Sequence, residues 1–133
     1  MNRFAYWLYT SKLWIRLLAL TGRVPAGFFL GWRRWMTLGD AQRCVGPGWS
    51  GLVAEGFNRC LKYGLRIHQI KEKFGGLRFY ADTDMSDLEA ASYEICEECG
   101  SPGEARADGW VKTLCDKCAE PEERYRRRER SWQ

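Results

Sequence analysis

Residues 96–118 read CEECGSPGEARADGWVKTLCDKC, in which two Cys-x-x-Cys pairs stand fifteen residues apart. Two residues between the cysteines of a pair let a tight turn, or knuckle, aim both thiolates at one ion, and two knuckles complete a tetrahedron. This spacing is typical of zinc ribbons. We therefore predict a metal site whose four ligands are Cys96, Cys99, Cys115 and Cys118.

Four sulfur ligands narrow the chemistry of the predicted site. Catalytic zinc usually keeps three protein ligands and an open position for water, whereas four thiolates close the coordination shell. Soft thiolates favour Zn²⁺, with an iron–sulfur cluster or a single iron as poorer alternatives. Disulfide pairing is the competing structural interpretation, but six cysteines are few for a disulfide-rich scaffold of 133 residues. We expect a structural Zn²⁺ in a reducing, cytoplasmic setting.

The spacer between the pairs predicts how the two knuckles meet. Asp108-Gly109 favours a two-residue β-turn, and short segments over 105–107 and 110–114 flank it. A β-ribbon over this spacer would bring the cysteine pairs together, and Gly100 would let the chain turn after the first pair. Residues 96–118 are therefore predicted to form a zinc ribbon.

The sequence before the ribbon contains helix and hairpin patterns. Apolar residues recur at three- and four-residue spacing over 49–62 and Gly64 follows, which predicts a helix with one buried face. Alternating apolar residues around Phe74-Gly75-Gly76 predict a β-hairpin. The Ser-x-x-Glu pattern that begins at Ser86 predicts a capping box and a second helix leading to Cys96.

These patterns predict an α+β fold class: a small helix–hairpin–helix core, a C-terminal zinc ribbon and a helical N-terminal segment rich in Trp and Arg. A chain of 133 residues is one domain by length. We expect four parts, namely a basic Trp-rich segment over 1–43, the α+β core over 44–95, the zinc ribbon over 96–118 and a charged tail over 119–133.

Charge is distributed unevenly along the chain. Residues 1–43 hold seven Lys and Arg against Asp40 alone, a charge of +6, while the whole chain carries +4. Residues 82–98 hold seven carboxylates and no basic residue. The basic segment therefore suits either an acidic partner or the acidic stretch of its own chain, and charge alone leaves both open.

The N-terminal segment contains the longest apolar stretch of the chain. Residues 13–32 include Arg16, Arg23 and Pro25, and arginine is costly in the middle of a bilayer. We therefore expect no membrane span, and no signal peptide, because Arg16 interrupts the apolar run. Packing on the core is the favoured interpretation; an anchor in the membrane plane and a partner surface are the alternatives. The partner surface would include Trp32, Arg33, Arg34 and Trp35.

Basic residues on the predicted hairpin form a second candidate partner surface. Lys71 and Lys73 lie at or near the tip and Arg78 follows in the second strand, where all three can contact a partner. His68 is the only histidine and has no serine, cysteine or carboxylate at a motif spacing, so no catalytic dyad or triad is predicted. Cys60 falls on the buried face of the first helix and is interpreted as a small apolar core residue.

Three segments together resemble a family of small, mostly uncharacterised proteins encoded by bacteriophages and prophages. They are CVGPGW (44–49), QIKEKFGGLRFYAD (69–82) and the helix that leads into the ribbon. The resemblance covers residues 42–118, and KEKFGGLRFY is its most specific part. It implies a phage origin, action in the bacterial host cytoplasm and zinc at the four ribbon cysteines, and it implies no reaction.

These observations lead to three hypotheses for function. The first is a phage-encoded, zinc-binding accessory protein that is not an enzyme and binds a host protein, for example to inhibit a defence system such as CRISPR-Cas or another host enzyme. The alternative is a zinc-ribbon protein that binds DNA or RNA. The third is a metal-dependent enzyme with a carboxylate site among Asp82, Asp84 and Asp87. A small-molecule substrate is not expected.

Overall fold

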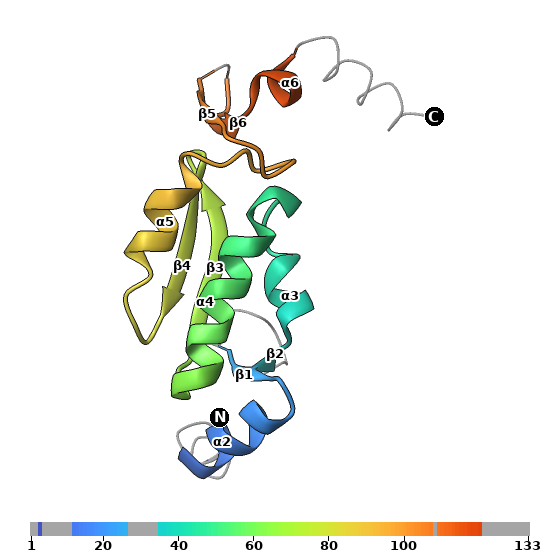
Figure 1. Ribbon diagram of the computed structural model, residues 1–133. Coiled ribbons are helices and arrows are strands. Elements are labelled where there is room, and N and C mark those ends of the chain that lie inside the picture. Colours follow the sequence, from blue (N-terminus) through green and yellow to red (C-terminus); the bar gives the residue numbers. More distant parts are fainter. Residues whose placement is uncertain (1–2, 4–11, 27–34, 108, 121–133) are drawn as a thin grey trace.

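Helix α4 (Ser50–Tyr63) and the antiparallel hairpin of β3 (Ile67–Lys73) and β4 (Gly76–Ala81) lie at the centre of the protein (Figure 1). In this computed structural model the described residues are 3, 12–26, 35–107 and 109–120. Over these residues the fold is mixed α+β, as the sequence predicts, and its strands form three two-stranded antiparallel sheets.

Helix α4 has the one-sided burial that its sequence predicts. Val53, Phe57 and Cys60 lie three or four residues apart on its buried face. The helix ends at Gly64, whose backbone is left-handed (φ 64°, ψ 42°) and whose N–H donates to the carbonyl of Cys60. Glycine adopts this conformation without the strain that a side chain would add. The predicted helix and its glycine stop are confirmed.

The hairpin turns through two residues of positive φ, Phe74 (52°) and Gly75 (79°). Turns of this kind match the right-handed twist of the flanking strands. Ile70 faces Phe79 across the strands and both are buried, so one face of the hairpin lies in the core. The predicted hairpin is confirmed, although Gly76 belongs to β4 rather than to the turn.

Helix α5 (Ser86–Ser92) covers the free amide groups of β4. The backbone N–H of Leu77 donates to Ser92 Oγ (2.9 Å), and the N–H of Phe79 donates to Glu89 Oε2 (3.1 Å). An uncovered strand edge would offer these donors to water or to another chain. The side chains of α5 therefore accept hydrogen bonds from the free edge of β4, in addition to packing on the hairpin.

The capping box predicted at the start of α5 is wrong. The N-cap is Met85, which makes no side-chain cap bond, and Ser86 Oγ donates instead to the carboxylate of Asp84 (2.9 Å). Glu89 accepts the β4 amide and does not cap the helix. Helix α5 also ends at Ser92, so a turn rather than the helix itself leads to Cys96.

The N-terminal elements contribute to the same core. Helix α2 (Lys12–Leu20) precedes β1 (Val24–Pro25), which pairs with β2 (Trp35–Met36), and α3 (Leu38–Gln42) follows. A capping box of Thr37 and Asp40 starts α3. The core cluster includes Val24, Ala26, Met36 and Ala41 together with residues of α4, the hairpin and α5, so it is larger than the predicted helix–hairpin–helix unit.

The apolar N-terminal stretch contains one short described helix. Helix α2 covers only nine residues before the chain turns at Gly22 into β1. Among the described residues no helix is both long and apolar enough to cross a bilayer.

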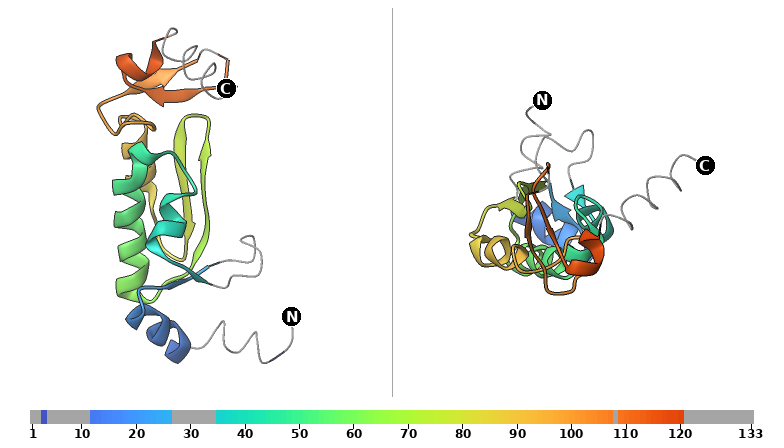
Figure 2. Two further views of the ribbon diagram at one scale, coloured as in Figure 1. Left: turned by 90° about the vertical axis from the view of Figure 1, so that its right-hand side faces the viewer. Right: turned by 90° about the horizontal axis from the view of Figure 1, so that it is seen from above.

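The cysteine-containing ribbon lies at one end of the core, and α2 lies at the opposite end (Figures 1 and 2). The strands of the ribbon are β5 (Glu104–Arg106) and β6 (Lys112–Leu114), and α6 (Asp116–Ala119) follows them. The predicted hairpin between the cysteine pairs is present. Its connection is longer than the predicted two-residue turn, because the last strand pair is Arg106 with Lys112. Asp108 lies outside the described residues.

Candidate metal centre

The two knuckles of the ribbon bring four sulfur atoms together. The Sγ atoms of the four ribbon cysteines all lie within 4.8 Å of one another, and Cys99 Sγ is 3.6 Å from Cys115 Sγ. Four sulfurs about 2.3 Å from a central ion would be separated by about 3.8 Å along each edge of the tetrahedron. The cluster therefore fits a four-coordinate metal ion. Its members are Cys96, Cys99, Cys115 and Cys118.

Local backbone geometry aims each cysteine pair inward. Gly100 has a φ of 80°, and its N–H donates to the carbonyl of Cys96 (2.9 Å), so the chain turns tightly after the first pair, as predicted. In the second pair, Cys115 is the N-cap of α6 and its Sγ accepts the N–H of Cys118 (3.4 Å). Amide groups pointing at sulfur stabilise thiolate character, which metal binding requires.

The centre is closed on its inner side and open on its outer side. Cys96 and Cys118 are buried, Cys115 is half-buried and Cys99 is exposed. Hydrogen bonds from the side chain and backbone of Ser101 lower the pKa of Cys99 to about 6. All six cysteines are free thiols in the structure, so the competing disulfide pairing is not present.

The ribbon is attached to the turn of the β3–β4 hairpin. Thr113 Oγ1, which is buried in β6, donates to the carbonyl of Gly75 (2.6 Å). The N–H of Glu97, inside the first knuckle, donates to the carbonyl of Thr113 (3.0 Å). One residue of β6 therefore connects the hairpin turn to the first knuckle.

The first knuckle also rests on the segment that precedes α4. The N–H of Gly48 donates to the carbonyl of Glu97 (2.9 Å), and the indole N–H of Trp49 donates to the carbonyl of Ile95 (2.9 Å). A Cβ at Gly48 would overlap the carbonyl of Cys96, and one at Gly46 would overlap the carbonyl of Glu97. Both glycines therefore permit direct contact between two backbones, which no other residue would allow. The CVGPGW segment, the hairpin turn and the cysteine ribbon meet at this junction.

The candidate partner residues of the N-terminal segment are only partly described. Trp32, Arg33 and Arg34 lie outside the described residues. Trp35 is exposed at the edge of β2, and the guanidinium of Arg23 lies 6.0 Å from the centroid of its ring.

The candidate partner residues of the hairpin are brought together. Lys71 lies directly opposite Arg78 across the strands, and Lys73 lies opposite Gly76 next to the turn. Because side chains alternate along a strand, Lys71, Lys73 and Arg78 share the face that points away from buried Ile70 and Phe79.

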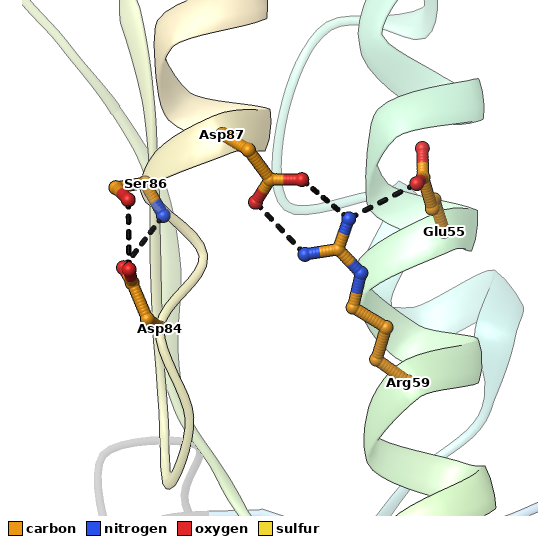
Figure 3. A network of polar contacts seen from close by, with 5 residues as sticks. All are labelled: Glu55, Arg59, Asp84, Ser86 and Asp87. Atoms are coloured by element: carbon orange, nitrogen blue, oxygen red, sulfur yellow. Dashed lines mark hydrogen bonds and ion pairs between the residues drawn. The ribbon is translucent and has the colours of Figure 1, made fainter.

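The three carboxylates considered for a catalytic site are held apart by different partners. Asp87 binds the guanidinium of Arg59, while Asp84 accepts hydrogen bonds from Ser86 (Figure 3). Asp82 interacts with His68 and Arg66. Among the described residues the four cysteines are the only group of metal-ligating side chains close enough to share an ion. The carboxylates therefore do not form the shared site that the third hypothesis needs.

The pair of His68 and Asp82 was not predicted from the sequence. His68 Nε2 lies 2.6 Å from Asp82 Oδ1, although fourteen residues separate them. The hairpin register pairs Ile67 with Ala81 and so places His68 and Asp82 at the open end of the hairpin. The predicted hairpin could therefore have indicated this pair from the sequence.

The nearby Cys60 is fully buried, and desolvation raises the pKa of its thiol to about 12, so Cys60 is inert as its apolar interpretation predicts.

Comparisons with known proteins identify no relative: no family model, no curated protein and no solved structure matches the chain.

Proposed function

We propose that this chain is a binding protein stabilised by one structural Zn²⁺, and that its function lies on its surface rather than at the metal. The observation that carries the proposal is the set of four cysteine sulfurs within 4.8 Å of one another. Four thiolates fill the tetrahedral shell of zinc and leave no position for water or a substrate. Zinc bound there would supply folding free energy to the ribbon.

The contacts around the first knuckle support a structural role. Glu97, the residue after Cys96, bonds through its backbone to Gly48 and to Thr113. Metal binding at Cys96 would therefore fix the ribbon on both the start of α4 and the turn of the hairpin. The expected result is a rigid hairpin whose outward face keeps one arrangement.

Metal analysis of the purified chain tests the zinc assignment. We expect one zinc per chain by elemental mass spectrometry, and a ratio near zero for Cys96→Ser and Cys115→Ser. Cys44→Ser is the matched control, because Cys44 is a free, half-buried thiol whose Sγ donates to the carbonyl of Asp40 away from the cluster. A zinc ratio far below one in freshly purified wild-type protein, or iron in its place, would contradict the proposal.

The first hypothesis for the partner, a bacterial host protein bound by a phage-encoded factor, is carried by the family resemblance. Its test is affinity capture of tagged full-length chain from bacterial lysate, followed by mass spectrometry. We expect one host protein to be enriched and to be lost with Trp35→Ala, since Trp35 is an exposed aromatic residue of the candidate surface. Equal capture by wild type and variant would exclude that surface.

Nucleic-acid binding is the second candidate because the hairpin gathers Lys71, Lys73 and Arg78 on one face. Clustered basic side chains on one face are the electrostatic footprint of such proteins.

A further inference from the structure

The outer face of the β3–β4 hairpin is the side directed away from α4. Its strand residues are Gln69, Lys71, Lys73, Arg78 and Tyr80, as the pairing of the strands requires. In Figure 2 (left), α4 lies on one side of the hairpin and no described helix covers the other. Helix α5 follows the edge of β4 and adds the ring of Tyr93 to this face, beside Gly76.

Every basic residue of the outer face lies near an aromatic ring. Lys71 Nζ is 5.8 Å from the ring centroid of Tyr80, and Lys73 Nζ is 5.7 Å from that of Phe74. The guanidinium carbon of Arg78 is 5.9 Å from the centroid of Tyr93, and its Nη2 donates to the Tyr93 hydroxyl (3.0 Å). The rings remain accessible, with exposed fractions of 42% for Tyr80, 61% for Phe74 and 39% for Tyr93.

The cations of the outer face make no ion pair among the described residues, although the hydrogen bond to Tyr93 and the nearby carboxylate of Glu89 raise the pKa of the Arg78 guanidinium. Neither Lys71, Lys73 nor Arg78 forms an ion pair with a carboxylate in the described part of the chain, whereas Arg59 and Arg106 each bind two. The one carboxylate of the two strands, Glu72, alternates to the other face, where it accepts the N–H of Gly75 (2.8 Å). The positive charge of the face is therefore available to a partner.

We propose that the outer face of the hairpin binds single-stranded nucleic acid, with its cations on the phosphates and its exposed rings stacked on bases. This inference rests on the proposed function, a binding protein made rigid by zinc. Basic grooves lined with aromatic rings bind single strands, since each unstacked base offers its face to a ring while its phosphate offers a charge. A protein partner is the other outcome of the test, since tyrosine and arginine are enriched and lysine is depleted at protein–protein interfaces.

Several contacts hold the rings in place before a strand binds. The ring of Tyr93 lies where a Cβ at Gly76 would be, and its hydroxyl is held by Arg78. Phe74 belongs to the turn that Thr113 of the ribbon holds through Gly75. A preformed surface loses less conformational entropy on binding than a flexible one.

Fluorescence anisotropy of the full zinc-loaded chain tests the proposal. The probes are fluorescein-labelled oligonucleotides of about twelve nucleotides, matching the site size of single-strand binders, made as oligo-deoxythymidine and oligo-uridine. Three phosphate contacts predict a slope of log affinity against log salt of about −2, since each single-strand contact contributes about −0.7. The double variant Lys71→Gln/Lys73→Gln should reduce that slope to about −0.7.

Ring variants separate stacking from charge. Tyr80→Ala should weaken binding by about 5- to 140-fold, the equivalent of one lost base–ring stack, while Tyr80→Phe should retain affinity. The matched control is Lys62→Gln/Tyr63→Ala at the end of α4, outside the two strands, where the Lys62 Nζ lies 5.3 Å from the ring of exposed Tyr63. This control should bind like wild type. Zinc content and circular dichroism are measured for every variant.

The possible outcomes test nucleic-acid binding by the outer face separately from the proposed zinc-stabilised binding protein. Salt-dependent binding that is lost with the outer-face variants and kept by the control supports it, and the two probes show whether DNA or RNA is preferred. Absence of binding at low salt, binding to duplex alone, or equal losses in the control overturn it. If the chain holds one zinc but binds no oligonucleotide, the nucleic-acid proposal fails and the proposed function still holds. If the outer-face variants abolish capture of a host protein, the outer face binds protein instead.

Discussion

Among the described residues, the hydrophobic core cluster holds fourteen buried apolar side chains, whereas the ribbon cluster holds three, of which two are the proposed ligands Cys96 and Cys118. Leu114 is the remaining one, and its burial is worth about 1.5–3 kcal/mol. Ordering the backbone of residues 96–118 costs on the order of tens of kcal/mol, at about 1–2 kcal/mol per residue. Apolar burial can therefore stabilise the core, whereas in the proposed function the ribbon draws its folding free energy from a bound metal ion.

Removing the metal should give the largest effect, in the ribbon and in the hairpin turn that Thr113 contacts. Structural zinc contributes about 10–16 kcal/mol in small zinc-finger peptides, so Cys115→Ser or chelation should unfold the ribbon. Hydrogen exchange should show loss of protection at Thr113 and Leu114, with protection of α4 and of the hairpin strands away from the turn retained. Cys44→Ser should leave both regions unchanged. Protected ribbon amides in metal-free protein would contradict the contrast between the two regions.

Truncating a buried side chain of the core should destabilise the core and leave the metal in the ribbon. Phe57 is 2% exposed on the inner face of α4, so Phe57→Ala should lower the free energy of unfolding by about 3–5 kcal/mol. The measurement is urea unfolding followed by circular dichroism. Tyr63→Ala, at a position 67% exposed on the same helix, should change that free energy by less than about 0.5 kcal/mol.

In that experiment the ribbon should respond differently from the core. Zinc should stay at one per chain for Phe57→Ala below the unfolding transition. If the variant lost its metal in the absence of urea, the two regions would fold as one unit instead of two.

The junction between the regions can be tested with two glycines that lie three residues apart. Gly48→Ala places a Cβ against the carbonyl of Cys96, whereas nothing lies within 4 Å of a Cβ at Gly51. Gly48→Ala should therefore destabilise the protein by about 1–3 kcal/mol, as overpacking does. Gly51→Ala should stabilise α4 by about 0.5–1 kcal/mol. Thermal unfolding of both variants measures the difference, and equal shifts would show that the knuckle does not press on Gly48.

Local signals in the sequence predict the helix, the hairpin and the metal ligands, and they do so for physical reasons. Gly64 ends α4 because its backbone is left-handed, and the cysteine spacing predicts the four sulfurs that the ribbon brings within 4.8 Å of one another. The α5 capping box fails because Glu89 accepts an amide of β4, which only the packed structure reveals. Gly46 and Gly48 give the pattern of a turn, but the requirement for glycine comes from the distant first knuckle.

The smallest expected effect belongs to an ion pair that joins two helices of the core. Arg59 of α4 binds Asp87 of α5 (2.8 Å), and this hydrogen bond lowers the pKa of the carboxyl to about 2 (Figure 3). Because the pKa in the folded state is below the unfolded value of about 3.9, the pair stabilises the core above pH 4. That contribution is lost as the pH falls from about 4 to about 2. The decline in urea midpoint over this window should therefore be shallower for Asp87→Asn than for wild type.

Two backgrounds distinguish this ion pair from other acid effects. In Arg59→Gln, the further change Asp87→Asn should alter the pH dependence much less, because the carboxyl has lost the main partner that lowers its pKa and keeps only backbone hydrogen bonds. Loss of metal in acid is common to all four proteins and cancels in the comparison. An Asp87→Asn curve parallel to that of wild type between pH 4 and 2 would show that the pair does not link α4 to α5, leaving apolar contact as what joins the two helices.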